Sequence, residues 1–167
     1  MDKIRLIKHL EAIEGYTALG MAEDALAEAD AALAEAPEAE VCLRAKAFLL
    51  LSLKRYAEAA PWFEKLLAAN PRNVEAWIHL AYCRRRTTSL DAAIETLQCA
   101  LRLDAGHPLA NYNMACYCAL KGRTEEALRL LKKAIRKDPA YRELARGEAD
   151  FDSIRALPEF CSLIGGS

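Results

Sequence analysis

Three consecutive arginines, Arg84, Arg85 and Arg86, form the only run of three like charges in the sequence. A guanidinium group binds a carboxylate or a phosphate through paired hydrogen bonds, so a cluster of arginines could receive an anionic ligand. The three residues stand at the end of a segment whose pattern predicts a helix. Positive charge at the C-terminal end of a helix also interacts favourably with the helix dipole, which stabilises the helix by about 0.3–1 kcal/mol. The cluster therefore has two interpretations, an anion-binding site or the solvated end of a helix.

Cysteine and histidine side chains are the other candidates for chemistry. No two cysteines form a CxxC pair, and the two-residue spacing of Cys116 and Cys118 separates their side chains by about 200° on a helix, too far for joint chelation. Of the three histidines, only His79 stands at a place where we expect it to face a ligand. No nucleophile and base pair, phosphate loop, zinc spacing or carboxylate dyad is present. We therefore expect no enzyme activity, no cofactor and no metal site.

The charge composition argues against two classes of partner. Twenty-three Lys and Arg residues face 24 Asp and Glu residues, and the net charge of −1 provides no field to hold nucleic acid or an anionic membrane. Residues 1–15 carry scattered charges without an apolar run of signal-peptide length, and no 18 consecutive residues are apolar. We therefore expect a cytoplasmic protein whose six cysteines are thiols.

The charges are nevertheless unevenly distributed along the chain. Residues 9–43 hold nine acids and no Lys or Arg, whereas residues 121–146 hold nine basic residues and four acids. Solvated helix faces are one interpretation of this asymmetry. End-to-end association, or docking of a partner in one orientation, is the other.

A period of about 34 residues organises the sequence, which indicates a repeat architecture. Segments that begin at Leu6, Glu40, Val74 and Pro108 align without a gap, and each splits into two apolar-periodic stretches of about 14 residues joined by a short turn. Each segment is therefore predicted to be a helical hairpin, in which small side chains let the two helices approach closely. One such column of the alignment holds Ala25, Ala59, Ala93 and Ala127.

Prolines mark the ends of the predicted hairpins. Pro37, Pro71 and Pro139 share one place in the alignment, and Ala105 is the departure. In that third segment we expect Gly106 to end the helix in a left-handed conformation, with Pro108 in the first turn of the next helix.

The repeat resembles the tetratricopeptide repeat family. The signature residues of that family occur in part in every segment, and the resemblance covers residues 6–139, about four fifths of the chain. The fourth segment, NYNMACYCALKGRTEEALRLLKKAIRKDP, is the closest continuous match. The other matches are Tyr16, Gly20, Ala25, Ala32 and Pro37 in the first segment, Tyr56, Ala59, Phe63 and Pro71 in the second, and Trp77, Leu80 and Ala81 in the third.

The resemblance implies an all-α fold, a right-handed α-solenoid of four antiparallel helix hairpins followed by capping helices. It predicts one domain over residues 1–167, with repeats at 6–39, 40–73, 74–107 and 108–141. Residues 142–164 keep an apolar pattern without the repeat, similar to the terminal element of bacterial members of the family, and we expect them to cap the last hairpin. Residues 165–167, the final GGS, are expected to form a disordered tail.

In this family the first helices of successive hairpins line a concave groove. Aromatic side chains there would offer rigid contact area, and arginines could receive an acidic group. The opposite interpretation is that the aromatic side chains pack between repeats and the arginines are solvated. Transferred column by column, the predicted peptide-binding groove consists of Arg44, Phe48, Ile78, His79, Tyr82, Arg85, Arg86, Tyr112 and Asn113, whereas Arg84 falls at a packing place.

The leading functional hypothesis is a non-enzymatic adaptor that binds an extended peptide or a partner helix carrying apolar and acidic residues. One alternative is a scaffold that assembles into a homo-oligomer through its acidic N-terminal and basic C-terminal repeats. Another is a chaperone of the kind that serves bacterial secretion systems, although no motif singles out that group. The lysine and asparagine clamp by which co-chaperones of the family grip a C-terminal carboxylate is absent from the corresponding places, so that mechanism is excluded.

Overall fold

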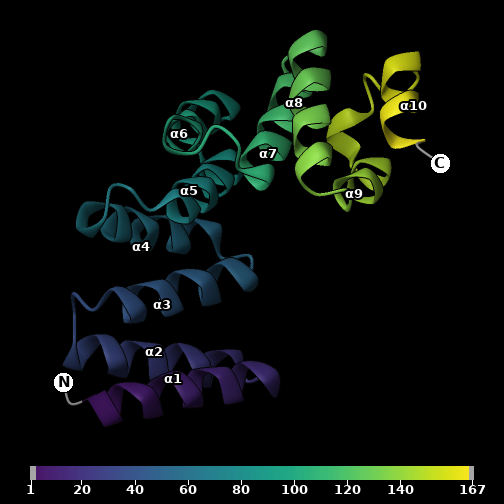
Figure 1. Ribbon diagram of the computed structural model, residues 1–167. Coiled ribbons are helices and arrows are strands. Elements are labelled where there is room, and N and C mark those ends of the chain that lie inside the picture. Colours follow the sequence, from purple (N-terminus) through teal and green to yellow (C-terminus); the bar gives the residue numbers. More distant parts are fainter. Residues whose placement is uncertain (1–2, 166–167) are drawn as a thin grey trace. The chain divides into compact units, whose positions relative to one another are not determined.

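A computed structural model describes residues 3–165 of the chain (Figure 1). Residues 166 and 167, part of the predicted disordered tail, lie outside the described residues. The chain divides into two compact units, residues 1–93 and residues 94–167. All regular structure between residues 3 and 165 is helical, and within this range no helix is long and apolar enough to cross a bilayer.

Eight long helices follow one another in the order and at the spacing that the repeat predicts for four hairpins. The second helices of the hairpins begin at equivalent positions of the repeat, and so do the first helices from α3 onward. The fold class is therefore confirmed as an α-solenoid of helix hairpins. The helices are α1 (Lys3–Ala18), α2 (Ala22–Glu35), α3 (Glu40–Ser52), α4 (Tyr56–Ala69), α5 (Val74–Thr87), α6 (Leu90–Leu103), α7 (Pro108–Leu120) and α8 (Thr124–Lys137).

In the unit of residues 1–93, α2 packs on α1, α3 on α2, α4 on α3 and α5 on α4. The alanine column explains the close approach, because Ala25 and Ala59 are fully buried between helices and a larger side chain would hold them apart. Phe63 and Leu66 are buried almost completely and fill the space between successive hairpins. The core of this unit is thus built from the repeating positions.

The turns that follow α1, α3 and α7 use a left-handed residue at equivalent positions. Gly20, Lys54 and Gly122 have φ of 72°, 59° and 71°, and they lie one or two repeats apart. In each turn the next amide reaches back to the last turn of the helix, as in the bond from Arg55 N to Leu50 O at 2.9 Å. Lys54 therefore occupies a position that favours glycine.

Turns between the hairpins show that one expectation was wrong. Gly106 does not have a positive φ. The Oδ1 atom of Asp104 accepts a hydrogen bond from Gly106 N at 2.9 Å, and Asn70 and Asp138 close the equivalent turns in the same way. A side-chain turn of this kind needs no left-handed residue, whereas the expected place of Pro108 in the first turn of α7 is confirmed.

In the unit of residues 94–167, α7 and α8 form a hairpin that three short elements cover. These are α9 (Tyr141–Gly147), η1 (Ala149–Phe151) and α10 (Pro158–Ile164). Helix α9 packs on α8, α10 packs on α8 and α9, and η1 lies on α7. Phe151 and Phe160 are completely buried, with ring centroids 5.5 Å apart, so the C-terminal segment is an integral part of this core.

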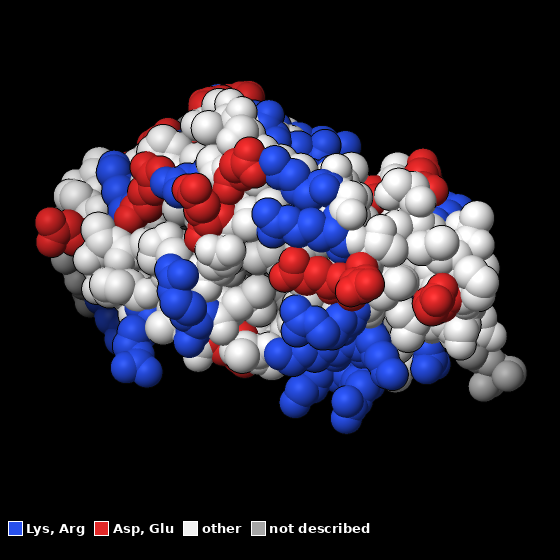
Figure 2. Space-filling view, turned by 90° about the horizontal axis from the view of Figure 1, so that it is seen from above, with Lys and Arg blue, Asp and Glu red and all other residues white. Residues whose placement is uncertain are grey.

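Several acids of α2 have partners inside the first unit. On α2, Glu23 pairs with Arg55 at 3.4 Å, Glu28 with His9 at 2.5 Å and Asp30 with Lys46 at 2.8 Å. Figure 2 shows Lys and Arg side chains in several groups on this face of the molecule, the largest of them at its lower edge, with Asp and Glu side chains between them. The acids of α2 are therefore used for packing between neighbouring hairpins as well as for solvation.

Candidate functional site

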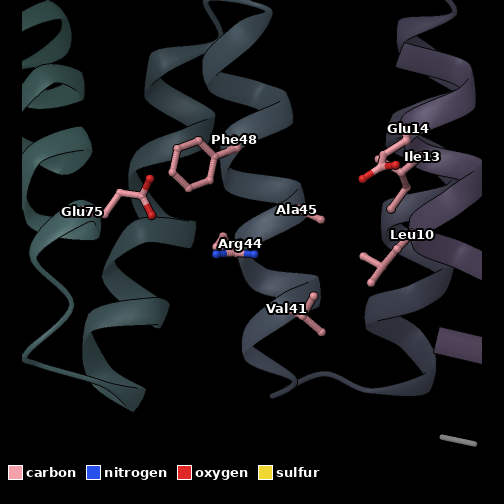
Figure 3. Close-up of a pocket in the computed structure, with 8 residues that line it drawn as sticks. All are labelled: Leu10, Ile13, Glu14, Val41, Arg44, Ala45, Phe48 and Glu75. Carbon is pink, nitrogen blue, oxygen red and sulfur yellow. The ribbon is translucent and has the colours of Figure 1, made fainter. Parts of the chain in front are cut away.

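A hollow of about 390 Å³ lies on the face formed by α1, α3 and α5, all within the unit of residues 1–93 (Figure 3). These are the first helices of three successive hairpins, which is the face on which the family resemblance predicts a groove. The residues that line it are Leu10, Ile13, Glu14, Val41, Arg44, Ala45, Phe48 and Glu75. The hollow is thus assembled from residues that are far apart in the sequence and close in the repeat.

The floor of the hollow is apolar. Leu10 and Ile13 come from α1, and Val41, Ala45 and Phe48 come from successive turns of α3. Their spacing of three or four residues places them on one side of each helix. Side chains of this kind could bury an apolar group of a ligand without further rearrangement.

Three charged side chains surround this floor. Figure 3 shows Arg44 on α3 between Glu14 on α1 and Glu75 on α5. All three residues are exposed, and among residues 3–165 none of them has a hydrogen bond or an ion pair through its side chain. The charges therefore alternate in sign across the three helices and face solvent at the rim.

Phe48 also belongs to an aromatic cluster behind the hollow. Its ring packs edge-on against Phe63 at 5.4 Å and against His79 at 4.8 Å, and His79 stacks on Phe63 at 5.7 Å. Edge-on and stacked geometries of this kind stabilise a core by about 0.5–1.5 kcal/mol per pair beyond the burial of area. Phe48 and His79 thus hold neighbouring hairpins together, and Phe48 in addition presents part of its ring to the hollow.

A second cluster joins α4 to the end of α5. The rings of Tyr56 and Tyr82 lie edge-on at 5.6 Å, and Arg86 Nη2 donates a hydrogen bond to Tyr82 Oη at 3.0 Å. The Arg86 guanidinium lies 5.1 Å from the centroid of the Tyr82 ring and 5.9 Å from that of Tyr56, a cation–π arrangement. Burial, followed by the hydrogen bond with Tyr82, raises the pKa of Tyr56. The side chain of Arg86 is therefore held in place although it is exposed.

The other two arginines of the cluster differ from Arg86. Arg84 forms an ion pair with Glu64 of α4 at 3.1 Å, and its side chain is half-buried. This agrees with its predicted packing place, because the charged end reaches an acid at the edge of the helix pair. Arg85 is also half-buried.

Two of the predicted groove residues are buried and not offered to solvent. Ile78 is 1% exposed and Tyr112 is 6% exposed. Tyr112 lies under the C-terminal segment, 4.9 Å from the ring of Tyr141 and 5.8 Å from that of Phe151. Asn113, on the next position of α7, is half-buried. Of the nine predicted residues, the structure thus brings Arg44 and Phe48 together in the hollow.

Acidic groups gather beside Tyr112. Cys116 on α7 and the carboxylates of Glu148 and Asp150 place their ligand atoms within 4.8 Å of one another. Glu148 Oε1 also accepts a hydrogen bond from Asp150 N at 3.3 Å and so caps η1. Burial first, and then the neighbouring thiol and carboxylates, raises the pKa of Tyr112. Although a thiol and two carboxylates can bind a divalent cation, the capping role of Glu148 already accounts for its position.

Several lining residues were not singled out from the sequence. Beyond Arg44 and Phe48, the lining includes six residues outside the predicted set: Leu10, Ile13, Glu14, Val41, Ala45 and Glu75. The sequence could have identified Glu14 as a lining residue, because it occupies the same position of the 34-residue repeat as Phe48.

Comparison with known proteins identifies the repeat. Family models described as tetratricopeptide repeat match residues 44–108 and 109–141, which together exceed half of the chain. The curated relative Superkiller protein 3 of Saccharomyces cerevisiae is 25% identical over 87 residues, 52% of this chain, but the match spans only 6% of that protein.

Solved structures show the same fold at low sequence identity. A crystal structure of MamA has a TM-score of 0.76 at 17% identity and covers 96% of this chain and 85% of its own. Residues 41 to the end of MamA from Desulfovibrio magneticus RS-1 give 0.72 at 21% identity, with coverage of 81% and 76%. YrrB, described as a TPR protein with an unusual peptide-binding site, gives 0.68 at 19%, with coverage of 95% and 86%. On the strength of its repeats and of these matches, the chain belongs to the tetratricopeptide repeat family.

Proposed function

We propose that this chain is an adaptor that binds an extended polypeptide segment in the hollow formed by α1, α3 and α5. Its family and its structural relatives support the broader role of a protein–protein interaction module. The observation that carries the finer proposal is the hollow itself, which combines an apolar floor with exposed charges on three successive first helices. The net charge of −1 supports a protein partner in preference to nucleic acid or a membrane surface, and the cytoplasm is the compartment we propose.

The dimensions of the hollow suit a short segment of polypeptide. A volume of about 390 Å³ falls in the range of ligand sites, roughly 300–1,000 Å³. An extended segment that crosses three helices would place one or two apolar side chains on the floor near Val41 and Phe48. Because Phe48 is held by Phe63 and His79, the segment would meet a surface that is already ordered, which lowers the entropy lost on binding.

A blocking substitution tests this proposal. Peptides that bind the wild-type chain are first selected from a displayed random library. Their affinity is then measured by fluorescence anisotropy for Ala45→Trp, which fills the hollow from its floor. Ala34→Trp is the matched control, since Ala34 is exposed on α2 and does not line the hollow.

The Ala45→Trp variant should lose at least ten-fold in affinity for the selected peptides, whereas the Ala34→Trp variant should bind them like the wild type. Thermal unfolding of both variants establishes that each is folded. Unchanged binding by a folded Ala45→Trp variant would show that the peptides bind elsewhere, and the proposed site would be abandoned.

A further inference from the structure

We infer that the ligand of the hollow carries a basic, an acidic and a basic residue at intervals of about three residues, with apolar residues between them. This inference rests on the proposed function and names the chemistry of the partner. It modifies the expectation from the sequence, which favoured apolar and acidic residues alone. The observation behind it is the alternating row of Glu14, Arg44 and Glu75 along the hollow (Figure 3).

The three charges differ from the acids on the other helix of the first hairpin. On α2, Glu23 and Asp30 each have a cationic partner from the same unit, and Glu28 contacts the ring of His9. Glu14, Arg44 and Glu75 have no ion pair within residues 3–165, although Figure 3 shows them along one hollow. Their charges are therefore available to a ligand without the loss of an existing pair.

The spacing of the ligand charges follows from the spacing of the helices. Packed helices lie about 8–10 Å apart, and a chain in the extended polyproline II conformation advances about 3.1 Å per residue. A segment that runs across α1, α3 and α5 therefore passes from one helix to the next in about three residues. A basic side chain beside Glu14, an acidic one beside Arg44 and a basic one beside Glu75 complete the pattern.

Apolar residues between the charges match the floor. In the polyproline II conformation three residues complete one turn, so the three charges share one edge of the segment. The residue after each charge shares another edge, from which it can reach Val41, Ala45 or Phe48. Burial of these side chains would supply most of the affinity. The exposed charges would mainly determine specificity. A peptide with the opposite charge pattern would place like charges next to Glu14, Arg44 and Glu75, and this repulsion would weaken its binding.

Two synthetic peptides that share their length and their uncharged residues, but have every charge exchanged, test the pattern. The first contains Lys-Leu-Ser-Glu-Phe-Ser-Lys between glycines, with both ends blocked. The second exchanges the charges to Glu-Leu-Ser-Lys-Phe-Ser-Glu. Binding of each fluorescent peptide to the full chain is measured by anisotropy at about 0.05 M and 0.5 M salt, since exposed charges are screened within about 3–10 Å at high to moderate ionic strength. The first peptide should bind about ten-fold more tightly at low salt, and this preference should shrink at high salt.

Charge reversal at one position provides the stricter test. Arg44→Glu should weaken the first peptide several-fold and should strengthen a variant peptide whose central Glu is replaced by Lys. Arg72→Glu makes the same change in net charge at an exposed residue outside the hollow, and it should leave both affinities unchanged.

The possible failures can be told apart. Equal binding of the two charge-exchanged peptides, or no rescue by the Lys peptide in the Arg44→Glu variant, overturns the charge pattern. If neither designed peptide binds while Ala45→Trp still blocks the selected peptides, the pattern is wrong and the hollow remains the binding site. If Ala45→Trp has no effect on the selected peptides, the proposed function itself fails.

Discussion

Lys54 is a lysine in a position built for glycine, so its replacement by glycine should stabilise the protein. Its φ is 59°, and the equivalent residues of two other hairpins, Gly20 and Gly122, have φ of 72° and 71°. A side chain with a Cβ atom in the left-handed region costs about 1–2 kcal/mol. Within residues 3–165 the Lys54 ammonium has no hydrogen bond or ion pair that would offset this cost.

The expected size of the effect follows from two opposing contributions. Lys54→Gly removes the strain of about 1–2 kcal/mol but makes the unfolded chain more flexible, which costs about 0.4–1 kcal/mol. The free energy of unfolding should therefore rise by about 0.5–1 kcal/mol. For a chain of this size that change corresponds to a rise in Tm of about 1–4 °C.

The same position in the other hairpins supplies matched controls. An added Cβ at Gly20 or Gly122 would meet no atom within 4 Å, so Gly122→Ala isolates the backbone effect and should destabilise by about 0.5–1 kcal/mol. Thr88, the equivalent residue in the third hairpin, has φ of −123°, and Thr88→Gly should therefore give no gain.

Thermal and urea unfolding of the three variants, followed by circular dichroism, would measure these differences. The reasoning predicts opposite signs for Lys54→Gly and Gly122→Ala. If Lys54→Gly destabilises the protein, or if Thr88→Gly stabilises it equally, the left-handed backbone is not the cause and the argument is refuted.

Two further predictions concern buried polar groups. Lys46 is 7% exposed and its ammonium pairs with Asp30 at 2.8 Å, so Asp30→Ala, which leaves that ammonium without its carboxylate, should destabilise by about 1–2 kcal/mol in urea unfolding. Lys46→Met removes both the charge and its need for a partner and should cost less than Asp30→Ala, and the reverse order would contradict this account. Burial raises the pKa of the Cys83 and Cys118 thiols from 9.0 to about 11. Since the pKa of each thiol is higher in the folded state than in the unfolded state, the two thiols contribute to stability below pH 9, and this contribution is lost as the pH rises through 11. Urea midpoints measured across this pH range should therefore fall more steeply for the wild type than for a variant that carries both Cys83→Ala and Cys118→Ala.

The fold could be predicted from the sequence because one short signal recurs. The buried alanines Ala25 and Ala59 stand one repeat apart, and a helix pair can approach closely only where such small residues stand. Turn conformations were harder to predict. Gly106 suggested a left-handed residue, yet the Asp104 side chain closes that turn, while Lys54 adopts the left-handed conformation that its residue type disfavours.

The candidate site contains two of the nine groove residues predicted from the sequence. Arg44 and Phe48 lie in the hollow because the repeat fixes the face on which they stand. The same reasoning placed Tyr112 on the corresponding face of α7, where the non-repeating Phe151 covers it. The repeat of the sequence predicts which helix positions are equivalent, but it does not predict where a segment without the repeat will pack.

The C-terminal segment that covers α7 has a consequence for competition between ligands. Residues 149–151 are joined to the hairpin on which they pack, so they act at an effective concentration that is on the order of millimolar for a short linker. A free peptide of micromolar concentration would have to bind α7 about a thousand-fold more tightly to displace them. An outside ligand could therefore reach this face of α7 only by displacing a segment of the same chain.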